Sequence, residues 1–159
     1  MKAQLLLLLT MLSLTVYAQD QSQAFDFWVG TWEVKWQGGS GINTITKTVD
    51  DKVLQENFEI TDGQNTGFKG TSISVYNPKS GLWHQAWADN NGGYYNFIGE
   101  IGEGKRIFKT LPIEKDGKTY IQRMAFKNIK EDGFNWYWEG SQDGGNTWNL
   151  LWEIAYSRL

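Results

Sequence analysis

The fold is decided by residues 25–36, FDFWVGTWEVKW, in which a short aromatic segment and a glycine precede a strand. After the glycine, Trp32, Val34 and Trp36 alternate with polar residues. This period of two predicts a β-strand that buries one face. The preceding residues 22–29 are the one segment that we predict as a helix, about two turns long. The rest of the chain must supply the core that covers the strand.

Alternating segments separated by turn residues make up the rest of the chain. Asp-Gly and Asn-Gly pairs recur along it, and such pairs favour the tight turns of β-hairpins. No segment has the pattern of a crossover helix, so we expect antiparallel strands. The sequence leaves open whether Asp50-Asp51 is a turn or a bend within one longer strand. The predicted strands are residues 31–36, 42–48, 53–60, 68–76, 83–89, 94–101, 106–113, 119–127, 134–140 and 148–156.

These segments predict an all-β fold, an antiparallel up-and-down barrel with a short N-terminal helix. About ten strands joined by hairpins favour closure, because a closed barrel has no unpaired edge strands. A barrel of about this size is either filled by side chains or holds one small ligand.

The predicted interior is aromatic with a few amide side chains. Alternation directs Trp87 and Trp138 inward, and we assign Gln55, Asn57 and Gln122 to the interior as its polar groups. Aromatic rings with a few polar groups are typical of a ligand cavity, so Trp87, Gln122 and Trp138 are the candidate ligand-binding residues. The alternative is that the tryptophans only pack the barrel ends. On the last strand we assign one shared face to Trp148, Leu150, Trp152, Ile154 and Tyr156.

Residues 1–18 have the features of a secretory signal peptide. Lys2 precedes an apolar run, and Val16-Tyr17-Ala18 resembles a cleavage site. We therefore expect an exported protein, periplasmic or secreted, with one domain of residues 19–159 and no membrane attachment after cleavage. The alternative is a retained N-terminal anchor. The formal net charge of −3 without Lys or Arg clusters argues against nucleic acid and anionic membranes as partners.

The segment Gly30-Thr31-Trp32 resembles the Gly-x-Trp signature of lipocalins and their calycin relatives. The resemblance implies that Trp32 closes one end of the barrel and that Arg158, from the last strand, packs over it. Gly30, Trp32 and Arg158 are then a structural plug of the barrel. More closely, the chain resembles a bacterial family of exported calycin-like proteins without an assigned function, through residues 25–32, 76–83, 87–89 and 141–148.

The pattern Ser141-x-Asp143-x-Gly145-x-Thr147-Trp148 matches the Asp-box of sialidases and other propellers. One copy cannot build a propeller, and we interpret the pattern as a hairpin turn in which Ser and Asp side chains bond the backbone.

His84 is the single histidine and the one candidate for a haem ligand, which haem-binding barrels of this type would need. Alternation directs His84 outward, so we expect no cofactor and keep haem as an alternative. We expect no metal site, because protein zinc sites use several His or Cys ligands. A Ser-His-Asp or Cys-His set is not recognisable. The candidate catalytic carboxylates are Glu56, Glu59, Asp89, Glu139 and Glu153, each of which also fits a solvated outer face.

The leading functional hypothesis is an exported protein that binds a small, partly apolar ligand in an aromatic lumen. One alternative is an enzyme, a hydrolase or an isomerase, that uses a lumen carboxylate on the same barrel. The other is a structural or interaction module with a filled core. The sequence predicts no reaction and no particular ligand.

Overall fold

The computed structural model describes residues 21–102 and 104–159, so the signal peptide predicted at residues 1–18 lies outside it. Among the residues described, no helix is long and apolar enough to cross a membrane. The elements in chain order are the 3-10 helices η1 (Gln21–Gln23) and η2 (Asp26–Trp28), followed by the strands β1 (Gly30–Trp36), β2 (Gly39–Thr48), β3 (Val53–Gly63), β4 (Lys69–Asn77), β5 (Leu82–Asp89), β6 (Tyr94–Gly102), β7 (Lys105–Thr110), β8 (Ile113–Lys115), β9 (Lys118–Lys127), β10 (Gly133–Ser141) and β11 (Asn149–Arg158).

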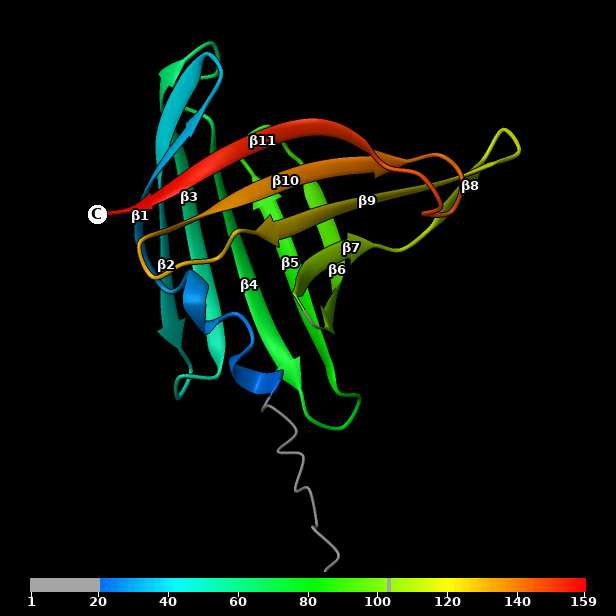
Figure 1. Cartoon of the computed structure of the whole chain (residues 1–159), viewed down its shortest axis with the longest axis horizontal. Helices are drawn as coiled ribbons and strands as arrows, with labels where there is room; N and C mark the ends of the chain where they lie inside the picture. Colours follow the sequence, from blue (N-terminus) through cyan, green and yellow to red (C-terminus); the bar gives the residue numbers. More distant parts are fainter. Residues whose placement is uncertain (1–20, 103) are drawn as a thin grey trace, which may run out of the picture.

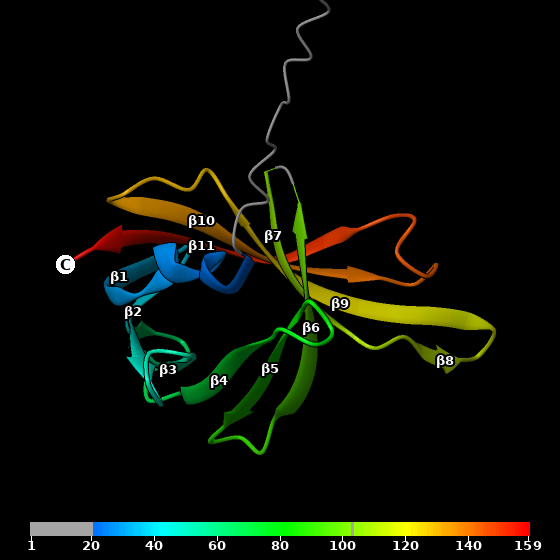
Figure 2. The same cartoon turned by 90° about the horizontal axis from the view of Figure 1, so that it is seen from below.

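The strands form one antiparallel sheet that closes on itself (Figure 1). Neighbours in sequence pair from β1 to β7, β7 pairs with β9, and β10 and β11 complete the circle back to β1. Ten strands make the barrel. The short β8 pairs with the start of β9, and this hairpin projects away from the barrel wall (Figure 2). The predicted all-β antiparallel barrel is confirmed.

Two strand boundaries depend on local backbone chemistry. The strand predicted at residues 106–113 is interrupted after Thr110, and Ile113 begins β8. Pro112 lies at the break, and its missing N–H cannot contribute to a sheet ladder. The open question at Asp50-Asp51 is resolved as a turn, because residues 49–51 have φ angles of 49°, 56° and 60°. The flanking segments β2 and β3 are therefore separate strands of one hairpin.

The segment predicted as a single helix at residues 22–29 forms two 3-10 turns instead. Phe25 lies between these turns and is fully buried, with its ring centroid 4.4 Å from that of Phe108 and 5.2 Å from that of Trp83. A helix of about two turns is marginal alone, so packing decides its geometry. The segment lies across one end of the barrel, which Figure 2 shows from below.

Gly30, Trp32 and Arg158 meet at this same end of the barrel. Trp32 is fully buried, and its indole Nε1 donates to the carbonyl oxygen of Trp28 at 2.8 Å. The Arg158 guanidinium carbon lies 4.1 Å from the Trp32 ring centroid, and its Nη1 donates to the Val29 carbonyl at 3.1 Å. Gly30 has a φ of 141°, and a Cβ there would collide with the guanidinium. The contact between Trp32 and Arg158 that the resemblance implied is present.

The Asp-box pattern forms the turn between β10 and β11. The Asp143 carboxylate accepts hydrogen bonds from the Ser141 hydroxyl at 2.7 Å and from the Thr147 hydroxyl at 2.6 Å. The backbone N–H of Thr147 donates to the same carboxylate at 2.9 Å, and that of Gly145 donates to the Ser141 hydroxyl at 2.8 Å. These bonds agree with the interpretation of the pattern as a hairpin turn.

Candidate functional site

The barrel interior contains a cavity of about 230 Å³ beyond the plugged end. Trp83 packs on Phe25 at the plug, whereas Trp87, four residues further along β5, lines the cavity. At a strand rise of about 3.3 Å per residue, Trp87 lies roughly 13 Å from Trp83 along β5. The lining residues, most of them aromatic, are Glu56, Phe58, Phe68, Trp87, Asp89, Tyr95, Phe97, Met124, Trp136, Trp138, Trp152, Ile154 and Tyr156.

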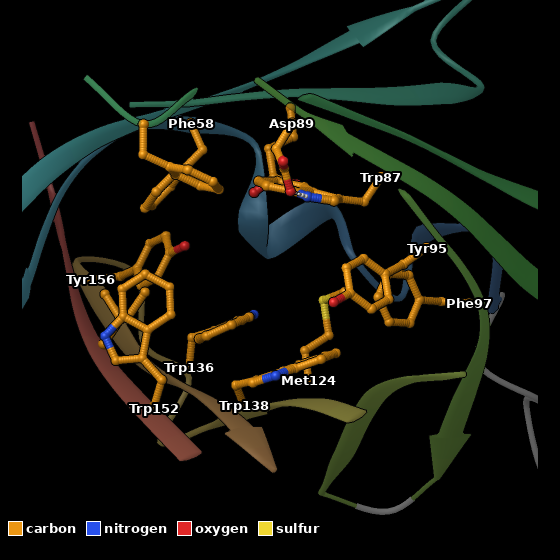
Figure 3. A pocket seen from close by; sticks show the side chains of 13 residues that line it. Phe58, Trp87, Asp89, Tyr95, Phe97, Met124, Trp136, Trp138, Trp152 and Tyr156 are labelled. Carbon is orange, nitrogen blue, oxygen red and sulfur yellow. Dashed lines mark hydrogen bonds between the residues drawn. The ribbon is translucent and has the colours of Figure 1, made fainter. Parts of the chain in front are cut away.

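The lining rings hold one another in place. Trp136 and Trp138, on the inner face of β10, have centroids 6.2 Å apart and planes within 5° of parallel. Trp152 of β11 meets Trp136 edge to face at 5.8 Å, and Phe97 of β6 meets Trp138 at 6.0 Å. Such offset and edge-to-face contacts are favourable for aromatic pairs. Figure 3 shows Trp136 and Trp138 on one wall and Trp87 on the opposite wall, with open space between them.

Gly70 makes room for the Trp87 side chain. It lies on β4 beside the end of β5, and a Cβ at this position would overlap the six-membered ring of Trp87. The backbone of Gly70 has an ordinary φ, so the requirement for glycine is steric. The orientation of Trp87 therefore depends on a neighbouring strand.

A β-bulge corrects the face predicted for the last strand. Trp138 pairs with Trp152 but the next residue, Glu139, pairs with Leu150, so Leu151 is an extra residue on β11. An inserted residue turns every side chain beyond it to the opposite face. The prediction that Trp148 and Leu150 share the face of Trp152 was therefore wrong. Leu150 is 55% exposed, and Trp148 stacks with Arg123 on the outer face, 3.7 Å from guanidinium carbon to ring centroid.

The inner face of β3 also differs from the prediction. Gln55 and Asn57 were assigned to the interior, but Gln55 is half-buried and Asn57 is exposed, and the buried residues between and beside them are Leu54, Glu56 and Phe58. Gln55 and Asn57 were assigned to the interior because their amides could serve as its polar groups. Leu54, Phe58 and Ile60 occupy alternate positions of the strand, and Glu56 lies in the same series. This alternation would have placed Glu56 inside.

Glu56 is the centre of a buried polar network. The Ser72 hydroxyl donates to Glu56 Oε2 at 2.6 Å, and Asn43 Nδ2 donates to Oε1 at 2.8 Å. Asn43 Nδ2 also donates to the Tyr156 hydroxyl at 3.0 Å. The network continues to Gln85, whose Nε2 donates to the Ser72 hydroxyl at 3.2 Å. The three donor residues come from three different strands, β2, β4 and β5, and all of them are neutral.

Burial controls the protonation of both acidic groups in the network. Burial raises the pKa of Glu56 from 4.5 to about 7, although hydrogen bonds from Ser72 and Asn43 lower it. Burial, followed by the nearby Glu56 carboxylate, raises the pKa of Tyr156 far above its ordinary value. Glu56 therefore exchanges a proton near neutral pH, whereas Tyr156 keeps its hydroxyl proton. Both residues line the cavity.

Asp89 is the second carboxylate of the cavity lining. It accepts from Trp87 Nε1 at 3.1 Å and from the backbone N–H groups of Asn91 at 3.0 Å and Gly93 at 2.8 Å. Desolvation raises the pKa of Asp89, but these hydrogen bonds together outweigh it and lower the pKa below its ordinary value. Asp89 is therefore ionised at neutral pH, and it anchors the indole of Trp87.

Of the three predicted ligand-binding residues, the structure brings two together. Trp87 and Trp138 line the cavity from opposite walls (Figure 3). Gln122 lies on β9, two residues before the lining residue Met124, and is half-buried outside the lining set. Its backbone N–H donates to the Thr110 hydroxyl at 3.0 Å. The carboxyl and hydroxyl groups of the lining set belong to Glu56, Asp89, Tyr95 and Tyr156, and the Gln122 amide is not part of it.

The other candidates lie on the outer face. His84 is exposed on β5 between the inward residues Trp83 and Gln85, and it does not line the cavity. Glu59 pairs with Lys69 at 3.0 Å, and Glu139 pairs with Arg123 at 2.6 Å on the outside of the barrel. Across residues 21–102 and 104–159, no group of three His, Cys, Asp or Glu side chains is arranged to hold a metal ion.

Comparison with models of known protein families gives no match for this chain. Comparison with curated proteins also gives no significant match. The resemblance to calycins therefore stays a prediction based on Gly30, Trp32 and Arg158.

Proposed function

We propose that this protein binds one small, partly apolar molecule in the aromatic cavity of the barrel. The observation that carries the proposal is the interior space of about 230 Å³, walled by aromatic rings and by the hydrogen-bonded carboxyl of Glu56. Apolar walls with a few fixed polar groups are typical of small-molecule sites. A module that needed only a filled core would not require open space beside a buried carboxyl.

We further propose that binding takes place outside the cytoplasm and that the chain is calycin-like. The composition of residues 1–18 supports export, and the absence of cysteine leaves an exported domain stabilised by its core. The plug at Gly30, Trp32 and Arg158 supports the likeness to calycins.

The second candidate function is an enzyme, and Glu56 is the observation that favours it. A buried carboxyl with a pKa of about 7 beside an open cavity can take a proton from a bound molecule and return it near neutral pH. This property fits general acid–base chemistry, as in an isomerase or a hydrolase. Tyr156 would then act as a hydrogen-bond donor that remains protonated.

Tryptophan fluorescence tests the binding function. Titration with indole, phenol, hexanoate and choline is expected to give a saturable change for at least one compound. Trp138→Phe is expected to weaken the binding of that compound and to reduce the fluorescence change, because Trp138 lines the cavity. Trp148→Phe is the matched control, since Trp148 stacks on the outer face. A saturable response that Trp138→Phe and Trp148→Phe change equally would contradict a site in this cavity.

The variant Glu56→Gln separates the two candidates. Glutamine keeps the shape of the side chain and one of its two acceptor oxygens but cannot exchange the proton. For a binding protein, a neutral ligand is expected to bind the variant as it binds the original chain. For an enzyme, binding is retained while conversion of the bound compound, followed by chromatography or NMR, is lost.

A further inference from the structure

The cavity lining has two acidic side chains and no basic side chain. Glu56 and Asp89 are the two charged residues among the lining side chains, and no Lys, Arg or His is in that set. Glu56 accepts from Asn43 and Ser72, which are neutral. Asp89 accepts from an indole and from backbone N–H groups. A ligand is therefore the natural source of positive charge for this space.

The basic side chains of the neighbouring strands lie on the outer face instead. Arg123 of β9 pairs with Glu139 and stacks on Trp148, and Lys127 lies 4.5 Å from the Tyr137 ring centroid. All of these contacts are on the side of the sheet opposite to Met124 and Trp138. The cavity carboxylates thus have no internal counter-charge from β9 or β10.

The aromatic walls of the cavity also favour a positively charged ligand. The face of an aromatic ring is electronegative, and a cation held within about 6 Å of a ring centroid is attracted to it, most strongly by tryptophan. Trp136 and Trp138 lie flat along one wall, and Trp87 faces them across the cavity (Figure 3). A positive group placed between these walls contacts several ring faces at once.

We propose that the ligand of this cavity is an organic cation, a quaternary or protonated ammonium group with small apolar substituents. The inference rests on the proposed binding function and names the chemical class of the ligand. The ammonium group lies between Trp87 and the Trp136–Trp138 wall, with Glu56 and Asp89 as its counter-charges. The apolar remainder of the ligand extends along the lining rings toward Tyr95, whose side chain is 37% exposed.

The test compares two probes of the same shape that differ in charge. Choline and 3,3-dimethyl-1-butanol are titrated into the purified full-length protein by calorimetry and by tryptophan fluorescence, with benzyltrimethylammonium as a larger cation and indole as a neutral aromatic probe. A cation is expected to bind about tenfold or more tightly than its neutral counterpart, because only the cation gains the ring and carboxylate interactions.

Two variants test whether the cavity carboxylates cause the preference for a cation. Glu56→Gln is expected to weaken the binding of choline about tenfold and to leave the binding of 3,3-dimethyl-1-butanol unchanged. Asp89→Asn, which retains a carbonyl oxygen for the bonds from the backbone, serves as the second variant if Glu56→Gln does not fold. Glu139→Gln is the matched control, because Glu139 is a carboxylate on the outer face, paired with Arg123.

The possible results are distinguishable. Equal or tighter binding of the neutral probe, or binding of indole without binding of either cation, would overturn the inference of a cationic ligand while the binding function stands. The inference would also be overturned if Glu139→Gln removed the preference for the cation while Glu56→Gln and Asp89→Asn kept it. If none of the four probes nor the wider panel bound, both the inference and the proposed function would be rejected.

Discussion

The guanidinium of Arg158 lies flat against the indole of Trp32, with its central carbon 4.1 Å from the ring centroid. The two residues are separated by almost the whole described chain, yet they are direct partners across the β1–β11 pair. This contact closes one end of the barrel, and neither residue lines the cavity. Stability and ligand binding are therefore assigned to different parts of one barrel, which allows separate tests.

Gly30→Ala is expected to destabilise the protein by more than the usual effect of a positive φ, because a methyl group would displace Arg158. We expect a loss of about 2–4 kcal/mol in the free energy of unfolding, measured with urea. Gly67→Ala is the matched control, since Gly67 has a φ of 91° and nothing within 4 Å of the added methyl. Equal losses for the two variants would show that Arg158 does not impose the requirement at Gly30.

Trp32→Ala is expected to cost about 3–5 kcal/mol in unfolding free energy, because it removes a fully buried indole and leaves a cavity. The same variant is expected to lower the midpoint of thermal unfolding strongly. Trp32 does not line the ligand cavity and reaches it through the lining residue Tyr156, 6.3 Å away between ring centroids, so the fraction that folds should still bind the ligand. A stable Trp32→Ala protein that had lost only binding would contradict the assignment of Trp32 to the plug.

Stability is expected to fall as pH rises from the acidic range to neutrality, and Glu56 is the cause. The pKa of Glu56 is about 7 in the folded protein against an ordinary 4.5, so the folded state binds more protons than the unfolded state between these values. The free energy of unfolding therefore decreases from about pH 4.5 to about pH 7 and then levels off. The full effect is on the order of 3–4 kcal/mol.

The measurement is urea unfolding at pH 5 and pH 8 for the original chain and for Glu56→Gln. The difference between the two proteins isolates Glu56 from the other titrating groups, including Asp89, whose pKa is lowered. The original chain is expected to lose more stability than the variant on going to pH 8. The same pH dependence in both proteins would mean that Glu56 is not held in a desolvated site.

Expression of the chain with its own leader in a bacterial host is expected to yield a periplasmic or secreted protein that begins at Gln19. The prediction follows from the apolar run and the Val16-Tyr17-Ala18 segment. Intact-mass spectrometry of the recovered protein measures the cleavage position. Recovery of membrane-bound protein that retains residues 1–18 would favour the anchor instead.

Much of the fold followed from local patterns. The period of two and the Asp-Gly and Asn-Gly turns located the strands within a few residues, and an antiparallel barrel was the arrangement that left no open edge. Trp87 and Trp138 were placed inward by the same alternation, and both line the cavity. These features depend on neighbours in the chain, so the sequence expresses them directly.

By itself, the sequence determined the strands, the turns and the inward parity of most aromatic residues, because each depends on a few adjacent side chains. Only the tertiary structure decided that Glu56 meets Asn43, Ser72 and Tyr156, that Leu151 is an extra residue, and that Gln122 lies outside the cavity lining. These features depend on register and on contacts between distant strands. A shift of one residue in pairing reverses every face beyond it, and alternation within a single strand carries no record of that shift.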